Sequence, residues 1–166
     1  FISSLPLMFI GFYLVQSGLI DKIRNLETIA WTTIIFGILL YISDKFKITK
    51  NIEDNFTIKS AIFIGMFQIL SLIPGVSRSG IAITAARLLC FKRVDSTKLS
   101  FLLSIPILGA VSAYGLKDIL FSNDIFFSKL NLITILLSFI FSIITIKYFL
   151  AYIKKFSMNI FVYYRI

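Results

Sequence analysis

The chain has 166 residues, of which 58% are hydrophobic and only 15% are charged. Soluble domains average roughly 45–50% apolar and about 25% charged residues, so this composition excludes a soluble globular domain and a disordered chain. The net charge of +9 does not indicate nucleic acid as a partner, because the basic residues lie mostly between apolar runs, where membrane topology explains them. The composition therefore predicts an all-α helical bundle that crosses the lipid bilayer several times.

Six apolar runs follow one another along the chain. They are Leu5–Ile20, Thr28–Ser43, Ser60–Ile73, Ile81–Phe91, Leu99–Leu116 and Leu130–Ile153. A membrane-spanning helix needs about 20 residues, which the first, second, fifth and sixth runs meet or approach. The third and fourth runs are shorter and flank the polar, helix-breaking segment PGVSRSG, residues 74–80.

The two short runs admit two arrangements. Either the third run crosses the membrane alone while the fourth lies on its surface, or both form a re-entrant hairpin, about residues 60–91, that returns to its starting side. The positive-inside rule favours the hairpin, which divides the basic residues 11 to 4, whereas a crossing divides them 6 to 9. The 11-residue side, which we assign to the cytoplasm, carries Lys45, Lys47, Lys50, Lys59, Arg87, Lys92, Arg93, Lys98, Lys147, Lys154 and Lys155. The other side carries Lys22, Arg24, Lys117 and Lys129.

Both ends of the sequence have the pattern of a truncated chain. Phe1 replaces an initiator methionine and already belongs to an apolar stretch, and Met158–Ile166 opens an apolar helix that stops after nine residues. A cleaved signal peptide is the alternative explanation for the start. We expect residues 1–166 to form a single, partial membrane domain.

The segment between the two short runs has the residue types of an anion-binding site. Gly75 and Gly80 let the backbone turn tightly and approach a ligand, and Ser77 and Ser79 offer hydroxyl groups. The following helix presents free N–H groups and the positive end of its dipole. Arg78 adds a charged fork that suits phosphate oxygens. Phosphate or diphosphate is the expected ligand class, and a short exposed loop whose arginine reaches lipid phosphates is the alternative.

Three polar side chains near this segment have ordinary structural explanations beside functional ones. Gln68 suits an interhelical hydrogen bond as well as a ligand contact. Thr84 is expected to donate a hydrogen bond to its own helix. Arg87 is expected to extend its charge toward the membrane surface.

Two motifs resemble those of a known family. Gly65–Gly80 (GMFQILSLIPGVSRSG) resembles the second signature of the undecaprenyl-diphosphatase family of the bacitracin-resistance type, and Ser100–Ala110 (SFLLSIPILGA) resembles its downstream motif. The closing Phe161–Ile166 is similar to the opening of that family's last helix. The resemblance covers most of the chain from Lys59 onward, which makes the chain similar to the C-terminal part of the family.

The resemblance implies a multi-pass phosphatase of the bacterial inner membrane that removes one phosphate from undecaprenyl diphosphate. This reaction regenerates a lipid carrier of cell-wall synthesis and confers bacitracin resistance. The family fold has two inverted repeats, each with a re-entrant helix pair, and its members use a divalent cation such as Mg²⁺ or Ca²⁺. The site residues then expected are Arg78 and Ser77 as catalytic, Gly75, Ser79, Gly80, Gln68 and Thr84 as substrate-binding, and none as a metal ligand.

The sequence departs from the family pattern in two places. Ala82 stands where members usually carry Thr, and Thr84 lies about 200° further around the helix, so it cannot replace the missing hydroxyl. The family's first signature, which supplies acidic residues, a serine and a histidine, is absent, and the sequence has no histidine. The chain alone is therefore expected to be inactive, with a missing N-terminal half or a second copy as its partner. The alternative function is a non-catalytic transporter or flippase of lipid phosphates, which needs no general base.

Overall fold

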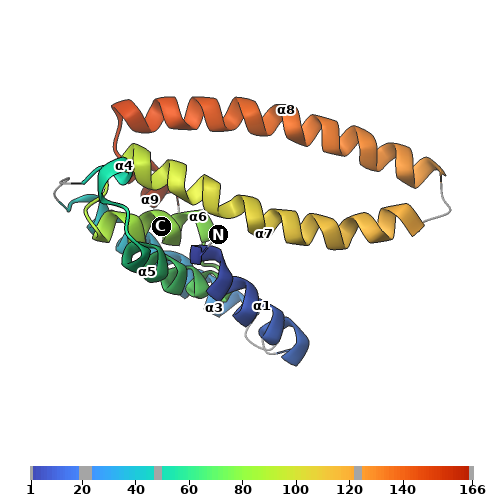
Figure 1. The fold of residues 1–166 in the computed structure, drawn as a ribbon, viewed down its shortest axis with the longest axis horizontal. Helices are drawn as coiled ribbons and strands as arrows, with labels where there is room; N and C mark the ends of the chain where they lie inside the picture. Colours follow the sequence, from blue (N-terminus) through green and yellow to red (C-terminus); the bar gives the residue numbers. More distant parts are fainter. Residues whose placement is uncertain (1, 19–23, 47–49, 122–124, 165–166) are drawn as a thin grey trace.

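The structure, a computed structural model, describes residues 2–18, 24–46, 50–121 and 125–164, with side chains left out at 15, 114, 116–121 and 125–128. In these ranges the chain forms helices and no strand (Figure 1). The helices are η1 (Ile2–Ser4), α1 (Leu5–Ser17), α3 (Leu26–Asp44), α4 (Ile52–Asn55), α5 (Ile58–Ile69), η2 (Leu70–Leu72), α6 (Arg78–Leu88), α7 (Arg93–Phe121), α8 (Ile125–Lys155) and α9 (Asn159–Tyr163). The all-α class predicted from composition is confirmed.

In the part of the chain that the structure describes, three helices are long and apolar enough to cross a membrane. They comprise Leu26–Asp44, Arg93–Ala113 and Lys129–Lys155, and they correspond to the second, fifth and sixth apolar runs. The first run, Leu5–Ile20, was expected to approach the same length; α1 accounts for 13 residues of it, and residues 19 and 20 lie outside the described residues. The helix ends there because Gly18 adopts a φ of +64°, the left-handed conformation that terminates many helices.

The helices α5 and α6 pack against each other as a hairpin, and their outer ends meet. The N–H of Lys50, just before α4, donates to the carbonyl of Cys90 at 3.2 Å, and the N–H of Lys92 donates back to the carbonyl of Lys50 at 3.2 Å. The rings of Phe56 and Phe91 lie 6.1 Å apart at the same end. The pair thus returns to the end of the molecule at which it began, while its position in a bilayer stays a prediction.

At the centre of the bundle lies α6, which contacts α3, α5 and α7 (Figure 1). Every residue from Gly80 to Arg87 is buried. Small residues such as Ala82, Ala85 and Ala86 allow neighbouring helices to approach closely. Ile64 of α5 is fully buried in a cluster with the last two of these alanines. The run that is too short to span a membrane is therefore the best-packed helix of the bundle.

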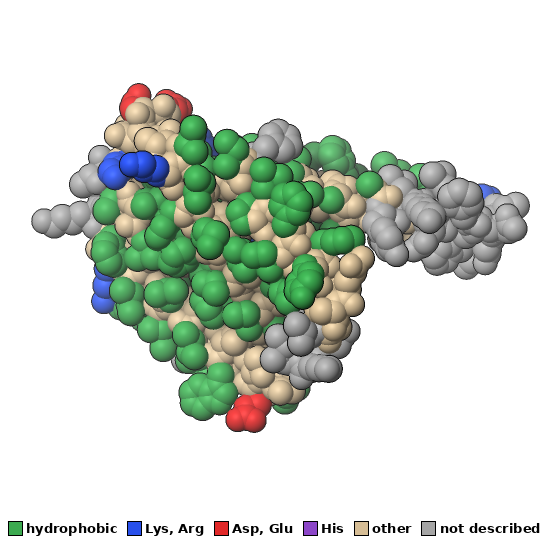
Figure 2. All heavy atoms as spheres, turned by 60° about the horizontal axis from the view of Figure 1, so that its bottom comes forward, with side chains coloured by type: hydrophobic (Ala, Val, Ile, Leu, Met, Phe, Trp, Pro, Cys, Tyr) green, Lys and Arg blue, Asp and Glu red, His purple; other side chains and the backbone are tan. Residues whose placement is uncertain are grey.

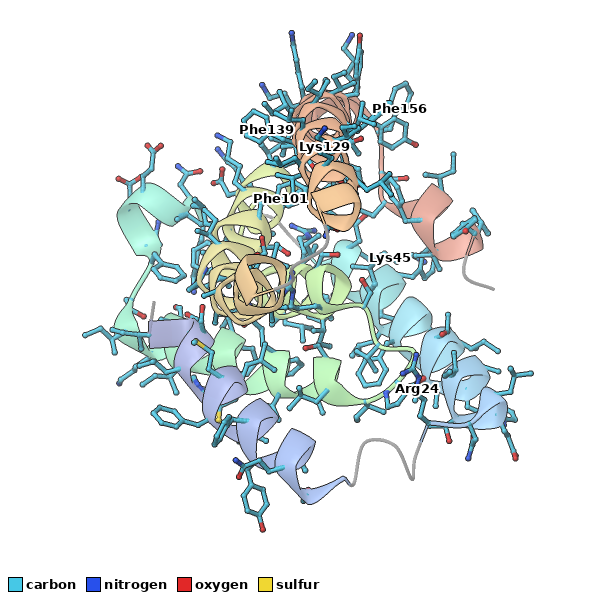
Figure 3. The ribbon with its side chains drawn as sticks, turned by 90° about the vertical axis from the view of Figure 1, so that its right-hand side faces the viewer. Arg24, Lys45, Phe101, Lys129, Phe139 and Phe156 are labelled. Carbon is cyan, nitrogen blue, oxygen red and sulfur yellow. The ribbon has the colours of Figure 1, made fainter. Side chains whose placement is uncertain are left out.

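The two long helices α7 and α8 lie side by side (Figures 1 and 3). Phe101 of α7 meets Phe149 of α8 edge to face, with ring centroids 5.8 Å apart. Ile153, near the end of α8, is buried, whereas most of the preceding apolar span is exposed, including Phe139 and Phe141. Figure 2 shows one face of the molecule on which hydrophobic side chains predominate and charged side chains lie near the edges. This surface suits lipid as its solvent.

Several basic residues predicted to share one side gather at one end of the structure. Arg87 and Arg93 both reach Asp44 at the C-terminal end of α3, where Lys45 follows. Arg24 lies at the opposite end of α3 (Figure 3). Other basic residues lie outside the part of the chain that the structure describes, namely Lys22, Lys47 and the side chain of Lys117.

Candidate functional site

The segment between η2 and α6 is a tight turn. The N–H of Val76 donates to the carbonyl of Ile73 at 3.1 Å. Between them Gly75 adopts a φ of +93°, which a residue with a side chain rarely tolerates. Ser77 then returns to extended backbone and begins α6 as its N-cap.

Two neighbouring helices hold this turn. The hydroxyl of Thr32 on α3 donates to the carbonyl of Pro74 at 2.6 Å. On the other side, the hydroxyl of Ser100 on α7 donates to the carbonyl of Ser79 at 3.2 Å. Val76 is buried and Arg78 is half-buried. The segment is therefore packed into the bundle and differs from the exposed loop of the alternative interpretation.

Three of the predicted site residues meet at the first turn of α6. The Oγ of Ser77 accepts a hydrogen bond from the N–H of Gly80 at 3.2 Å, and it lies 3.2 Å from the Oγ of Ser79. The N–H groups of Arg78 and Ser79 start the helix, where no carbonyl of a preceding turn is available to them. The start of α6 therefore presents two hydroxyl groups and unpaired backbone donors.

Arg78 supplies the positive charge at this helix start. In the described part of the chain both ion pairs involve Asp44, and neither includes Arg78. Its side chain is half-buried, and Ser77 and Ser79 are its neighbours in the sequence. A guanidinium without a carboxylate partner, next to a helix N-terminus, has the electrostatics of an anion-binding site.

Gln68 and Thr84 occupy deeper positions than the residues of the first turn. Gln68 is 1% exposed, and its Oε1 has no hydrogen-bond partner among the described residues. Thr84 is also 1% exposed, and its hydroxyl donates to the carbonyl of Gly80 at 2.8 Å, which confirms the expected hydrogen bond to its own helix. The structure brings Gly75, Ser77, Arg78, Ser79 and Gly80 together in one turn, and it places Gln68 and Thr84 in the packed interior.

The prediction that Arg87 extends toward the membrane surface is wrong. Its side chain is 1% exposed and donates to the carbonyls of Phe91, Asp44 and Phe46 at 2.7, 2.8 and 2.9 Å. The Nε lies 3.4 Å from the Oδ1 of Asp44. The carbonyls bind the two terminal nitrogens and the Asp44 carboxylate balances the charge, while the Nε makes no hydrogen bond among the described residues. Arg87 therefore joins helices together and is not available to a ligand.

The described residues do not fit a divalent cation. No group of three or more His, Cys, Asp or Glu side chains that could hold a metal ion is found among them. The turn from Pro74 to Gly80 contributes a cation, Arg78, and no carboxylate. Hard divalent cations prefer carboxylate and carbonyl oxygens, so the side chains of this turn suit an anion and not a metal ion.

Sequence reasoning missed the residues that hold the turn. Thr32 lies in an apolar run where threonine usually bonds to its own helix, so its sequence gives no sign of a contact with Pro74. Ser100 lies in the downstream motif SFLLSIPILGA, which marked the segment but not the contact with Ser79. Asp44, at the end of the second apolar run, is 5% exposed, and only its position next to that run could have drawn attention to it.

Apolar helices of spanning length pack around a turn whose arginine has no carboxylate partner among the described residues. They define a membrane protein with a candidate site for an anionic ligand. The chain belongs to the family described as bacitracin resistance protein BacA, which matches residues 1–166. The family resemblance noted in the sequence is thereby confirmed.

Curated relatives agree with this assignment. An undecaprenyl-diphosphatase of Pelagibacter ubique is 51% identical over 166 residues, which cover 99% of this chain and 64% of the relative. A protein of the same name from Campylobacter curvus is 46% identical over 158 residues, 93% of this chain and 59% of the relative. An undecaprenyl-diphosphatase of Jannaschia sp. is 32% identical over 165 residues, which cover 99% of this chain and 62% of the relative. The chain thus spans somewhat less than two thirds of the length of these relatives.

Proposed function

We propose that this chain supplies the diphosphate-binding part of an undecaprenyl-diphosphatase in the bacterial inner membrane. The enzyme would convert undecaprenyl diphosphate to undecaprenyl phosphate, which recycles the lipid carrier of cell-wall synthesis and confers bacitracin resistance. The names of the relatives support the activity. The observation that carries the site is the guanidinium of Arg78, which has no carboxylate partner among the described residues at the start of α6.

The residues of this turn suit the chemistry of a diphosphate. Phosphoryl transfer depends mainly on positioning and on stabilisation of charge on the phosphate oxygens. Arg78 would bind two of these oxygens through its planar fork, and the first N–H groups of α6 would bind a third. The Oγ of Ser77 accepts from the N–H of Gly80 and lies 3.2 Å from the Oγ of Ser79, so one of these two hydroxyl groups donates to the other. The remaining hydroxyl proton would be donated to the ligand, and Ser79 is the exposed residue of the turn.

The reaction needs groups that this turn does not contain. Hydrolysis requires a base or nucleophile to activate the attack on phosphorus. The turn carries no carboxylate, and the sequence has no histidine. We therefore assign the base or nucleophile, and the ligands of any Mg²⁺ or Ca²⁺, to an N-terminal half, because a second copy of the chain would also lack histidine. The α5–α6 hairpin would be re-entrant and face its counterpart in an inverted repeat.

Phosphate release from undecaprenyl diphosphate tests this proposal. The chain would be joined to the N-terminal segment of its Pelagibacter relative, because the chain alone is expected to be inactive. We expect Arg78→Ala to lower kcat/KM about 100-fold, the scale for removing a group that stabilises transition-state charge. Arg24→Ala, at an exposed arginine before α3, is the matched control and should retain activity. Near wild-type turnover by Arg78→Ala would exclude the role of Arg78, and movement of the lipid without phosphate release would favour a flippase.

A further inference from the structure

The hydroxyl of Thr32 has its nearest hydrogen-bond acceptor outside its own helix. Three carbonyl oxygens lie within reach of its Oγ1, those of Thr28 at 2.8 Å, Ile29 at 3.2 Å and Pro74 at 2.6 Å. A hydroxyl has one proton to donate, and the nearest acceptor belongs to the turn and not to its own helix. Thr32 therefore connects α3 to the turn that precedes α6.

The backbone of the turn is built to accept this contact. At Gly75 an added Cβ would overlap the Oγ1 of Thr32 and would lie 2.6 Å from the carbonyl oxygen of Ile29. The absence of a side chain thus allows the turn to lie directly on α3. Proline precedes the glycine and fixes its own φ, so the Pro74 carbonyl has little freedom once it is bonded.

We propose that Thr32 is a positioning residue for the diphosphate-binding turn. Its hydroxyl fixes the Pro74 carbonyl, and only three residues separate Pro74 from Arg78. The bond therefore sets the direction in which α6 begins and in which the guanidinium is presented. This inference rests on the proposed function for the role of Arg78, but the contact of Thr32 with the turn does not.

Two other threonines provide matched controls. Thr33, the next residue on α3, has its nearest acceptor in its own helix, the Ile29 carbonyl at 2.6 Å, and lies 3.3 Å from the Gly75 carbonyl. Thr134 on α8 donates to the carbonyl of Leu130 at 2.9 Å, within its own helix. Replacement by valine keeps the shape of each side chain and removes the hydroxyl.

The first measurement is the Kd for inorganic diphosphate, determined by calorimetry on the full chain in detergent micelles. We expect Thr32→Val to weaken binding roughly three- to tenfold, the range for loss of one internal hydrogen bond that orders a site. Thr32→Ser keeps the hydroxyl and should restore binding to within about twofold of the wild type. Thr33→Val should have a smaller effect than Thr32→Val, and Thr134→Val should have none.

The second measurement reports on the turn without a ligand. Val76 is buried, so a Val76→Cys variant in a Cys90→Ser background should react slowly with a water-soluble maleimide. Thr32→Val should raise this labelling rate several-fold, because the turn opens more often when its bond to α3 is lost. Thr134→Val should leave the rate unchanged.

The two measurements distinguish failure of the positioning role of Thr32 from failure of the proposed diphosphate ligand. If the wild type binds diphosphate and Thr32→Val changes neither Kd nor labelling, the positioning role is overturned while the proposed function stands. If Thr32→Val raises labelling but the wild type does not bind diphosphate, the hold of Thr32 on the turn is supported and the proposed ligand is overturned. Loss of binding in Thr32→Ser as well as Thr32→Val would assign the effect to packing and overturn the role of the hydroxyl.

Discussion

The side chains of Arg87 and Asp44 lie together in the interior, with the Nε of Arg87 3.4 Å from the Oδ1 of Asp44 and side-chain exposures of 1% and 3%. The Nε of Arg93 donates to the same Oδ1 at 2.7 Å, and the N–H of Met158 donates to Oδ2 at 3.4 Å. One carboxylate therefore joins the end of α3 to α6, to the start of α7 and to the turn before α9. Removing it would leave the buried guanidinium without its counter-charge.

Asp44→Asn should destabilise the fold strongly. The amide keeps the size of the side chain but removes the negative charge, and breaking a buried ion pair from one side costs about 3–5 kcal/mol. We expect the midpoint of thermal unfolding in detergent micelles to fall markedly, as followed by circular dichroism. Asp54→Asn, at an exposed residue of α4, is the control and should unfold like the wild type. Equal midpoints for the two variants would show that the ion pair contributes nothing to stability.

This ion pair also shows what the sequence could not predict. Motif and composition indicated the membrane class, four runs near spanning length that include the three long helices of the structure, and the turn at Arg78, because these depend on residue types close together in the chain. Arg87 and Asp44 are 43 positions apart, and the partner of a charged residue depends on how the helices pack. A lone arginine in an apolar run predicts extension toward the surface, and tertiary contacts with three carbonyls reversed that expectation.

Contacts between helices also explain why the sequence predicted only part of the turn before α6. The sequence predicted that Gly75 and Gly80 permit a tight backbone, and the structure gives Gly75 a φ of +93°. It did not predict that Thr32 lies on that glycine, because a threonine in a helix gives the same pattern whether it bonds within or between helices. The burial of α6 was not predicted either, because the run is too short to span a membrane and its close packing depends on alanines and a glycine that let the neighbouring helices approach.

Gly75→Ala should displace the turn. Alanine at a positive φ costs about 1–2 kcal/mol, and its Cβ would lie 2.6 Å from the backbone oxygen of Ile29, which cannot move without distorting α3. We expect a lower unfolding midpoint and at least tenfold weaker binding of inorganic diphosphate by calorimetry. Gly109→Ala is the matched control, because an added Cβ there meets nothing within 4 Å. Wild-type affinity in Gly75→Ala would show that the turn tolerates a different backbone.

Gly65→Ala should disturb the packing of η1 (Ile2–Ser4) against α5. An added Cβ at Gly65 would lie 2.7 Å from the backbone oxygen and 3.0 Å from the Cα of Ser3, which is itself buried. Overpacking of this kind typically costs 1–3 kcal/mol. The expected result is a lower midpoint of thermal unfolding, while Gly115→Ala, in open space on α7, should be neutral or slightly stabilising. An unchanged midpoint for Gly65→Ala would mean that η1 is not held tightly against α5.

The hairpin predicts the side of the membrane from which its two ends can be labelled. The backbone bonds between Lys50 and residues 90–92 bring the start of α5 and the end of α6 to one end of the structure. Lys59→Cys and Lys92→Cys, each exposed and each in a Cys90→Ser background, should therefore react with an impermeant maleimide from the same side of sealed vesicles. Arg24→Cys, at the other end of α3, should react from the opposite side, since α3 is long and apolar enough to span the bilayer. If Lys59→Cys and Lys92→Cys react from opposite sides, the α5–α6 pair crosses the membrane and is not re-entrant.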